Sequence, residues 1–186
     1  VETLEHTRDR GLSVTVYQGQ RKGTASCGDL EPDTIRETVQ RAVDIARYTQ
    51  EDPYCGLAQA ELMATEFPDL DLFHPNLMTA EDGIDRALRC EQAGRDEDSA
   101  ISNSEGASFG SNLAIAAYGN SHGFLASDWG TSFSQSIALI AGSGSNMQRD
   151  YWWDSRRSLE ALESPEQTGR IAAQRTAQRL GARQVK

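Results

Sequence analysis

The chain has 186 residues, a formal net charge of −10 and an apolar fraction of 38%. Nucleic-acid binding needs clustered Lys and Arg, so this acidic balance disfavours DNA or RNA as the principal ligand. No stretch approaches the ~20 consecutive apolar residues of a membrane span. Residues 1–10 also lack the apolar segment of a signal peptide. We therefore expect a chain with no direct nucleic-acid or membrane partner.

The cysteines indicate the cellular compartment of the protein, and the arginines near the C-terminus show that its charge is unevenly distributed. Cys27, Cys55 and Cys90 form no CxxC pair and no disulfide framework, which fits a reducing, cytoplasmic compartment with each thiol acting as a small apolar residue. Arginines at 170, 175, 179 and 183, with Lys186, give a basic tail. We expect a solvated helix face there, and a site for phosphate or an acidic partner is the alternative.

The first third of the chain predicts a hairpin, a helix and a loop. Residues 12–17 alternate apolar and polar side chains, and residues 22–27 return as a second strand after a short turn at Gly19. Pro32 favours the start of a helix that runs to about Tyr48. The segment after this helix is rich in Pro and irregular, so we expect a long ordered loop with a short helical turn at its centre.

A second helix is predicted from a capping box. Thr79 is a suitable N-cap, and Asp82 stands three residues later. We expect Ile84 and Leu88 to face inward and the helix to end near Gly94.

The rest of the chain predicts a β-meander followed by a helix. Gly- and Ser-rich breaks separate the expected strands, which are residues 101–109, 112–118, 123–127, 131–141 and 147–156. Ser164, Pro165 and Gln167 then provide an N-cap, first turn and third helical position. That helix should reach Leu180, with Gly181 closing it.

Strands and helices are segregated rather than alternating, which predicts an α+β fold. We expect a two-layer arrangement, in which an antiparallel β-sheet of hairpin plus meander has helices packed on one face. Residues 1–186 are expected to form a single domain, and residues 157–186 to include a helix that leads to a further domain.

Catalytic motifs are scarce in this sequence. The histidines at 6, 74 and 122 are far apart, and none belongs to an HExxH or HExxxH helix of the kind that holds zinc in proteases. We expect each to be a surface or hydrogen-bonded histidine. Residues 142–145 only approach the G-x-S-x-G pattern of a serine hydrolase and lack its final glycine. No catalytic, cofactor-binding or metal-binding residue is therefore assigned.

Two segments are candidates for a peptide or partner surface. In residues 101–109, Asn103, Ser104 and Glu105 lie in a strand rich in small polar residues. A bulged strand, with Asn103 and Ser104 bonded to local backbone and Gly106 supplying permissive geometry, is the simpler interpretation.

The second segment contains three consecutive aromatic residues. Strand alternation places Tyr151 and Trp153 on one face and Trp152 on the other. One face should be core, and the remainder either exposed surface or an interface anchor.

These segments also resemble a known family. The similarity is to the PmbA (TldE-type) subunit of the bacterial TldD/PmbA family, which was first described as modulators of DNA gyrase. It extends in order over nearly the whole chain and is carried by residues 11–17, 21–26, 46–49, 68–75, 101–109, 119–123 and 149–151.

The resemblance implies a two-subunit metalloprotease that acts on unfolded peptides, including an antibiotic-peptide precursor and an antitoxin. Zinc is expected only in the TldD-type partner, through an HExxxH motif, and no cofactor is expected in this chain. Full family members are more than twice as long, with elements before Val1 and a domain after Lys186. This chain would then be a non-catalytic N-terminal domain that serves subunit assembly and substrate enclosure, inactive alone. The alternative is a non-enzymatic regulator that binds gyrase or another protein.

Overall fold

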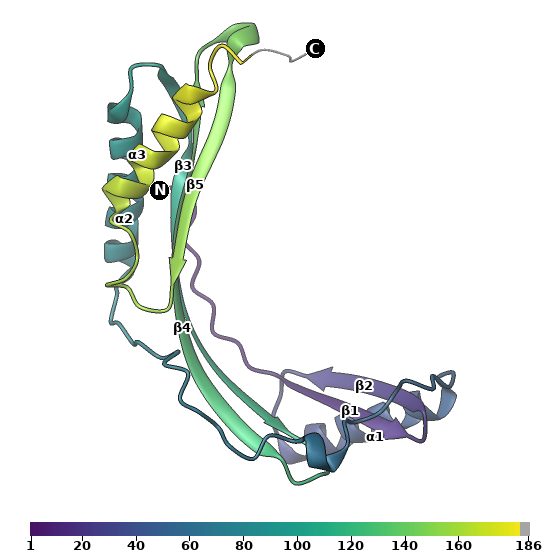
Figure 1. Cartoon of the computed structure of the whole chain (residues 1–186). Helices are drawn as coiled ribbons and strands as arrows, with labels where there is room; N and C mark the ends of the chain where they lie inside the picture. Colours follow the sequence, from purple (N-terminus) through teal and green to yellow (C-terminus); the bar gives the residue numbers. More distant parts are fainter. Residues whose placement is uncertain (183–186) are drawn as a thin grey trace. The chain divides into compact units, whose positions relative to one another are not determined.

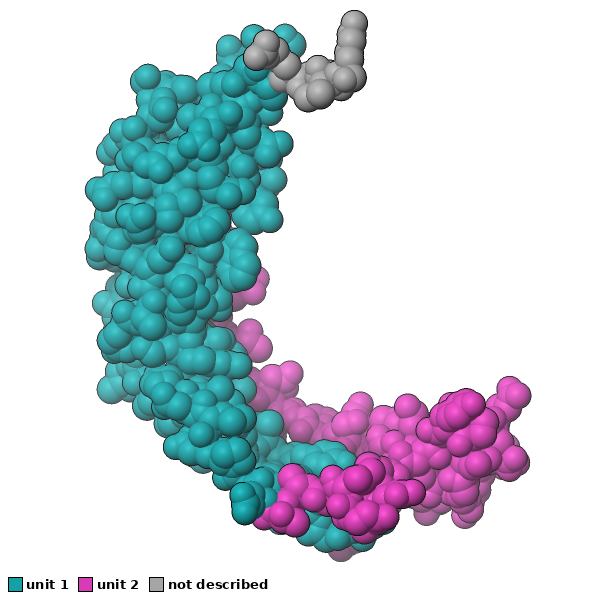
Figure 2. Space-filling view, viewed as in Figure 1, with its two compact units in different colours: residues 1, 66–186 teal, residues 2–65 magenta. Residues whose placement is uncertain are grey.

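The computed structural model describes residues 1–182. The chain divides into two units, one of residues 2–65 and the other of residue 1 with the residues from 66 onward (Figure 2). Each contains an antiparallel sheet and helices, as expected for an α+β fold (Figure 1). The elements are β1 Leu12–Gln18, β2 Arg21–Cys27, α1 Pro32–Tyr48, η1 Ala60–Leu62, α2 Ala80–Glu97, β3 Ile101–Gly119, β4 Leu125–Ala141, η2 Gly144–Asn146, β5 Gln148–Arg156 and α3 Pro165–Gln178.

The smaller unit is a hairpin with one helix. β1 and β2 pair in register from Leu12 opposite Cys27 to Gln18 opposite Arg21, which confirms the predicted hairpin. α1 packs on this hairpin at Gly23, where an added Cβ would lie 2.0 Å from the carbonyl oxygen of Ala42. Glycine is therefore needed at this position for the helix to approach the strand.

The larger unit is built on a three-stranded sheet in the order β3–β4–β5, all antiparallel. Alternate residues of β4 are buried against α2 and α3, so both helices cover the same face of the sheet. The buried set on β4 is Thr131, Phe133, Gln135, Ile137, Leu139 and Ala141. The core of the unit joins Ile137 and Leu139 to Cys90 of α2 and to Ala172 and Ala173 of α3.

The predicted end of the second helix was wrong. α2 begins with the expected Thr79–Asp82 capping box but continues through Gly94 to Glu97. Gly94 is buried where α2 and α3 are close, and an added Cβ on Gly169 of α3 would lie 2.8 Å from the Gly94 nitrogen. The glycine permits helix contact rather than ending the helix. Leu88, expected to face inward, is 53% exposed.

The meander has fewer and longer strands than predicted. The expected breaks at Gly110 and before Thr131 are absent, because β3 and β4 pair continuously from Phe109 opposite Gln135 to Gly119 opposite Leu125. Gly110 pairs with Ser134 as an ordinary strand residue. The turn after Gly119 is confirmed, with the Asn120 backbone N–H donating to the Phe124 carbonyl.

The start of the last helix and the burial of the cysteines follow the predictions, whereas the helix ends at Gln178, two residues before the predicted Leu180. The Ser164 side chain accepts from the Gln167 N–H, and Gly181 adopts a positive φ of 72° just beyond the helix end. Cys90 is buried and the other two thiols are half-buried. Burial raises the pKa of Cys90 to about 12, so this thiol is unreactive near neutral pH. No helix among the described residues is long and apolar enough to cross a bilayer.

Candidate functional site

The face of the three-stranded sheet opposite α2 and α3 carries most of the residues singled out from the sequence. We refer to it as the open face. Two of its aromatic side chains, Tyr151 and Trp153, are 52% and 57% exposed. Its principal residues are Asn103, Glu105 and Ser108 of β3, Ser136 of β4, and Arg149, Tyr151 and Trp153 of β5.

The strand register places small residues beside the two aromatic side chains. Tyr151 is opposite Ala138, which is in turn opposite Gly106. Trp153 is opposite Ser136, whose hydroxyl lies 2.8 Å from the hydroxyl of Ser108 on β3. The open face therefore presents two aromatic rings on β5 next to a stretch of β4 and β3 with short side chains. Such a surface leaves room for a partner chain to lie beside the rings.

An ion pair closes one end of the open face. The Arg149 Nη2 lies 2.6 Å from Oε2 of Glu105, across the intervening strand β4. The hydrogen bond from Arg149 lowers the pKa of Glu105, and the same bond raises the pKa of Arg149. Both side chains are exposed, so the pair adds little to stability. The main effect of the pair is to keep the Arg149 guanidinium and the Glu105 carboxylate together at this end of the open face.

β3 is bulged at the predicted segment. The register shifts between Ile101 and Asn103 and again between Ser104 and Gly106. The Asn103 side chain accepts from the Ser104 N–H, and the Ser104 hydroxyl accepts from the N–H of Gly106, which has a φ of 101°. The expected bulged strand with local side-chain bonds is confirmed. The bulge turns Glu105 toward the open face, where it reaches Arg149.

Two of the six predicted surface residues lie elsewhere. Ser104 is half-buried, and Trp152 packs against the core on the helix-covered face. The Trp152 Nε1 donates to Oε2 of Glu163 at 3.1 Å, and the guanidinium of Arg175 lies 5.3 Å from its ring centroid. The structure thus brings Asn103, Glu105, Tyr151 and Trp153 together and separates Trp152 from them, as strand alternation predicted.

A buried polar network holds the sheet against the helices. Gln135, only 3% exposed, donates to the Glu163 carbonyl at 2.8 Å and to the Thr168 hydroxyl at 2.6 Å. Its Oε1 accepts from Arg86 of α2. The Glu163 N–H in turn donates to Asp154 of β5 at 2.9 Å. These bonds link β4, β5, α2 and the start of α3.

This network was missed in the sequence, although one signal was present. Gln135 is a large polar residue at an inward position of an otherwise apolar alternation. Arg86 lies above the Phe109 ring at 5.3 Å, and desolvation lowers its pKa. Its Nε lacks a hydrogen-bond partner among the described residues. The network is structural in character, because it lies beneath the sheet and away from the open face.

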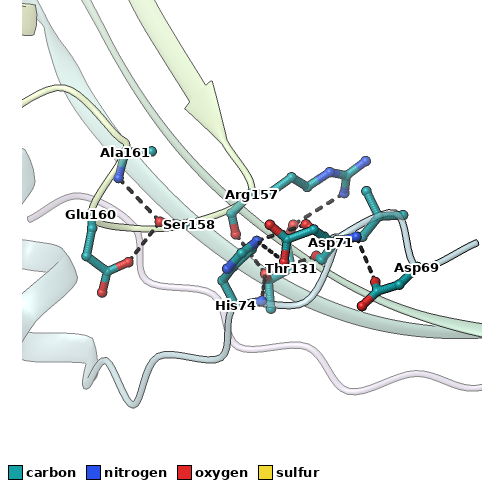
Figure 3. A network of polar contacts seen from close by, with 9 residues as sticks. Asp69, Asp71, His74, Thr131, Arg157, Ser158, Glu160 and Ala161 are labelled. Atoms are coloured by element: carbon teal, nitrogen blue, oxygen red, sulfur yellow. Dashed lines mark hydrogen bonds and ion pairs between the residues drawn. The ribbon is translucent and has the colours of Figure 1, made fainter.

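The loop before α2 forms a second polar cluster, in which Asp71 and His74 lie close to Thr131 and Arg157 (Figure 3). The Thr131 N–H donates to the Leu72 carbonyl, and the His74 N–H donates to the Thr131 hydroxyl, both at 2.9 Å. The His74 Nε2 lies 2.8 Å from the Asp71 carbonyl oxygen. The Thr131 hydroxyl donates to the Arg157 carbonyl. His74 is therefore the hydrogen-bonded histidine that was predicted, and the cluster fixes the loop to the edge of β4.

Among the described residues, the possible metal ligands are dispersed and the arginines of the basic tail lie near carboxylates. No three His, Cys, Asp or Glu side chains gather within the described part in a way that could hold a metal ion. The arginines of the basic tail that the structure describes each lie near a carboxylate, and two of them share one. Arg175 and Arg179 lie 3.5 Å from Asp150, and Arg170 lies 3.6 Å from Glu97. The tail residues Arg183 and Lys186 lie outside the described residues.

The larger unit is thus an α+β unit in which two helices cover one face of an antiparallel sheet. Two family models match this chain in succession. Residues 1–46 match domain 1 of the PmbA/TldA metallopeptidases, and residues 73–180 match their central domain. The chain belongs to the PmbA/TldD metallopeptidase family.

Curated relatives agree with this assignment over the whole chain. It is 44% identical over 185 residues to the metalloprotease PmbA of Escherichia coli O157:H7 and 38% identical to a PmbA homologue of Haemophilus influenzae. In both comparisons all of this chain is covered, but only 41% of the relative. The chain thus spans about two fifths of the length of the relatives it matches.

Solved structures share the fold. A candidate modulator of DNA gyrase from Bacteroides thetaiotaomicron matches with a TM-score of 0.84 at 25% identity, over 95% of this chain and 41% of that one. TldE from Thermococcus kodakarensis matches with a TM-score of 0.65 at 17% identity, over 91% of this chain and 42% of that one. At 17% identity the latter likeness shows the fold alone.

Proposed function

We propose that this chain is a non-catalytic part of a PmbA (TldE-type) subunit, which assembles with a TldD-type subunit into a metalloprotease for unfolded peptides. In this proposal the zinc lies in the TldD-type subunit, and the assembly is cytoplasmic. The role of this chain is to take part in subunit assembly and to enclose the substrate. The observation that carries the proposal is the open face, a sheet surface with two exposed aromatic rings beside short side chains, in a chain of this family.

The open face suits an extended, unfolded peptide. Tyr151 and Trp153 offer large apolar contacts with little loss of side-chain freedom, and the short side chains of β4 and β3 leave space for a peptide backbone. In the part of the chain that the structure describes, β3 and β5 are the outer strands of the sheet, and a peptide can add main-chain hydrogen bonds along their outer edges. These contacts select for an extended chain rather than for a particular sequence.

Assembly is tested with the full-length protein as bait in native lysate, followed by mass spectrometry. We expect near-stoichiometric recovery of a subunit with an HExxxH motif. Recovery of gyrase without such a subunit would instead support the non-enzymatic regulator and contradict the proposed protease role.

Peptide enclosure is tested in the assembled two-subunit complex with a Y151S/W153S double variant. We expect KM for an unfolded peptide to rise about 5- to 30-fold, the loss of roughly 1–2 kcal/mol of aromatic contact, with kcat unchanged. Tyr48→Ser is the matched control, because Tyr48 is an exposed aromatic residue of the smaller unit. An equal KM in the wild type and the double variant would exclude the open face as a substrate surface.

A further inference from the structure

The three-stranded sheet continues as a two-stranded ribbon. The last β4–β5 pair is Phe133 with Arg156. Two residues earlier in β4, the Thr131 N–H donates to the Leu72 carbonyl instead of to β5. Beyond this point β3 and β4 remain paired with each other, from Ala114 opposite Gly130 to Gly119 opposite Leu125. We call this part, residues 112–119 and 125–130, the ribbon.

One face of the ribbon is apolar and exposed. The register places Ile115 beside Trp129 and Leu113 beside Thr131, on the same side of the two strands. The exposed fractions of Leu113, Ile115, Trp129 and Leu125 are 54%, 58%, 49% and 76%. The ring of Phe73 meets Trp129 edge-on at 5.5 Å and covers it only in part. No charged side chain lies on this face, since Asp128 belongs to the other one.

Exposed apolar side chains gathered on one face of a two-stranded ribbon are typical of a binding site. A partner packed on this face would also stabilise the ribbon, which extends beyond the third strand and the helices. The helix-covered sheet contrasts with the ribbon, because there β4 buries alternate residues under α2 and α3.

The place where the chain leaves the sheet after α3 favours a second polypeptide as the partner of the ribbon. α3 ends at Gln178, and Leu180 lies against Gly142 at the end of β4 remote from the ribbon (Figure 1). Along β4, the way from Ala141 to Gly130 is roughly 36 Å at ~3.3 Å per residue. The relatives are longer than this chain, and the matched domain is described as central. A domain that continues from α3 therefore starts at the opposite end of the sheet from the ribbon.

We propose that the ribbon is an assembly arm, whose apolar face packs against the second subunit of the protease. This inference rests on the proposed function, which supplies the second subunit. The contact is apolar and uncharged on this side, so it should persist at high salt. The side chains that carry it are Leu113, Ile115, Leu125 and Trp129.

Photo-crosslinking tests directly which polypeptide packs on the ribbon. The crosslinking residue is placed at position 115 of the full-length protein, which is co-expressed with the TldD-type subunit. We expect a crosslinked product with the mass of both subunits, and none from the same group at Gln92, which is exposed on α2. A crosslink confined to one chain, to a second copy or to a substrate peptide would overturn the inference.

A charge-insertion pair tests the energetics. Ile115→Asp should reduce co-purification of the TldD-type subunit at least tenfold, at both low and high salt. Ala114→Asp, which places the same charge on the other face of the ribbon, opposite Gly130, should leave it within twofold. If the wild type binds and Ile115→Asp binds equally well, only this inference fails. If the wild type binds no TldD-type subunit, the proposed function itself fails.

Discussion

Trp152 and Trp153 are adjacent in β5, yet the structure gives them opposite environments. Trp152 packs on the core, donates to Glu163 and lies beneath the Arg175 guanidinium. Trp153 faces away from the helices and is more than half exposed. The difference comes from the two helices, which cover only one side of the sheet. Residue type alone therefore does not decide which tryptophan stabilises the fold and which is available for binding.

The same contrast extends over all three strands. On the covered face, Gln135 and the residues around it are fully packed and joined by the buried polar network. On the open face, the Ser108 hydroxyl contacts that of its cross-strand neighbour Ser136, and Tyr151 and Trp153 are more than half exposed. The core packing of the unit lies on the covered face, so substitutions on the two faces should have very different consequences.

The largest contrast should come from two neighbouring residues of β4. Leu139→Ala removes a fully buried side chain from the core and should cost about 2–5 kcal/mol. Ile140→Ala, on the open face, should cost much less. Hydrogen exchange of the α2 and α3 backbone amides in the full-length protein measures the local stability of this unit. Equal losses of protection in the two variants would contradict the division of the sheet into covered and open faces.

A smaller effect is expected from the polar network. Gln135→Leu keeps the size of the side chain but leaves the Glu163 carbonyl and the Arg86 guanidinium without this partner. We expect a loss of roughly 1–3 kcal/mol in the same exchange measurement. Ser134→Ala, one residue earlier and on the open face, should change stability by no more than about 0.5 kcal/mol. A neutral Gln135→Leu would mean that the network does not hold the sheet to the helices.

The smallest effect belongs to the exposed Glu105–Arg149 pair. Because Arg149 lowers the pKa of Glu105, the pair stabilises the fold above the glutamate's unfolded pKa, and this contribution disappears as pH falls through the lowered value. NMR titration of the Glu105 carboxyl carbon should show a midpoint below the usual range for glutamate. Arg149→Gln should return that midpoint to the usual range while leaving exchange protection of the helices unchanged. An unshifted midpoint in the wild type would show that the pair does not form in solution.

Local features were predictable from the sequence because their causes are local. The Thr79–Asp82 capping box, the Ser164 N-cap and the hairpin around Gly19 all depend on residues a few positions apart. Strand alternation likewise separated Trp152 from Tyr151 and Trp153, and the Asn103–Gly106 segment carried the signs of a bulge. The family resemblance followed from the order of such segments along the chain.

Only the tertiary structure decided the features that depend on distant contacts. A glycine such as Gly94 is typical of a helix end. In the structure, however, Gly94 lies inside α2 and allows this helix to approach Gly169 of α3. Gly110 suggests a turn, yet pairing with Ser134 on β4 keeps β3 extended. The Glu105–Arg149 pair and the Gln135 network join residues 44 and 28 positions apart, respectively. Sequence periodicity specifies which residues share a face, whereas packing between elements determines which face is covered.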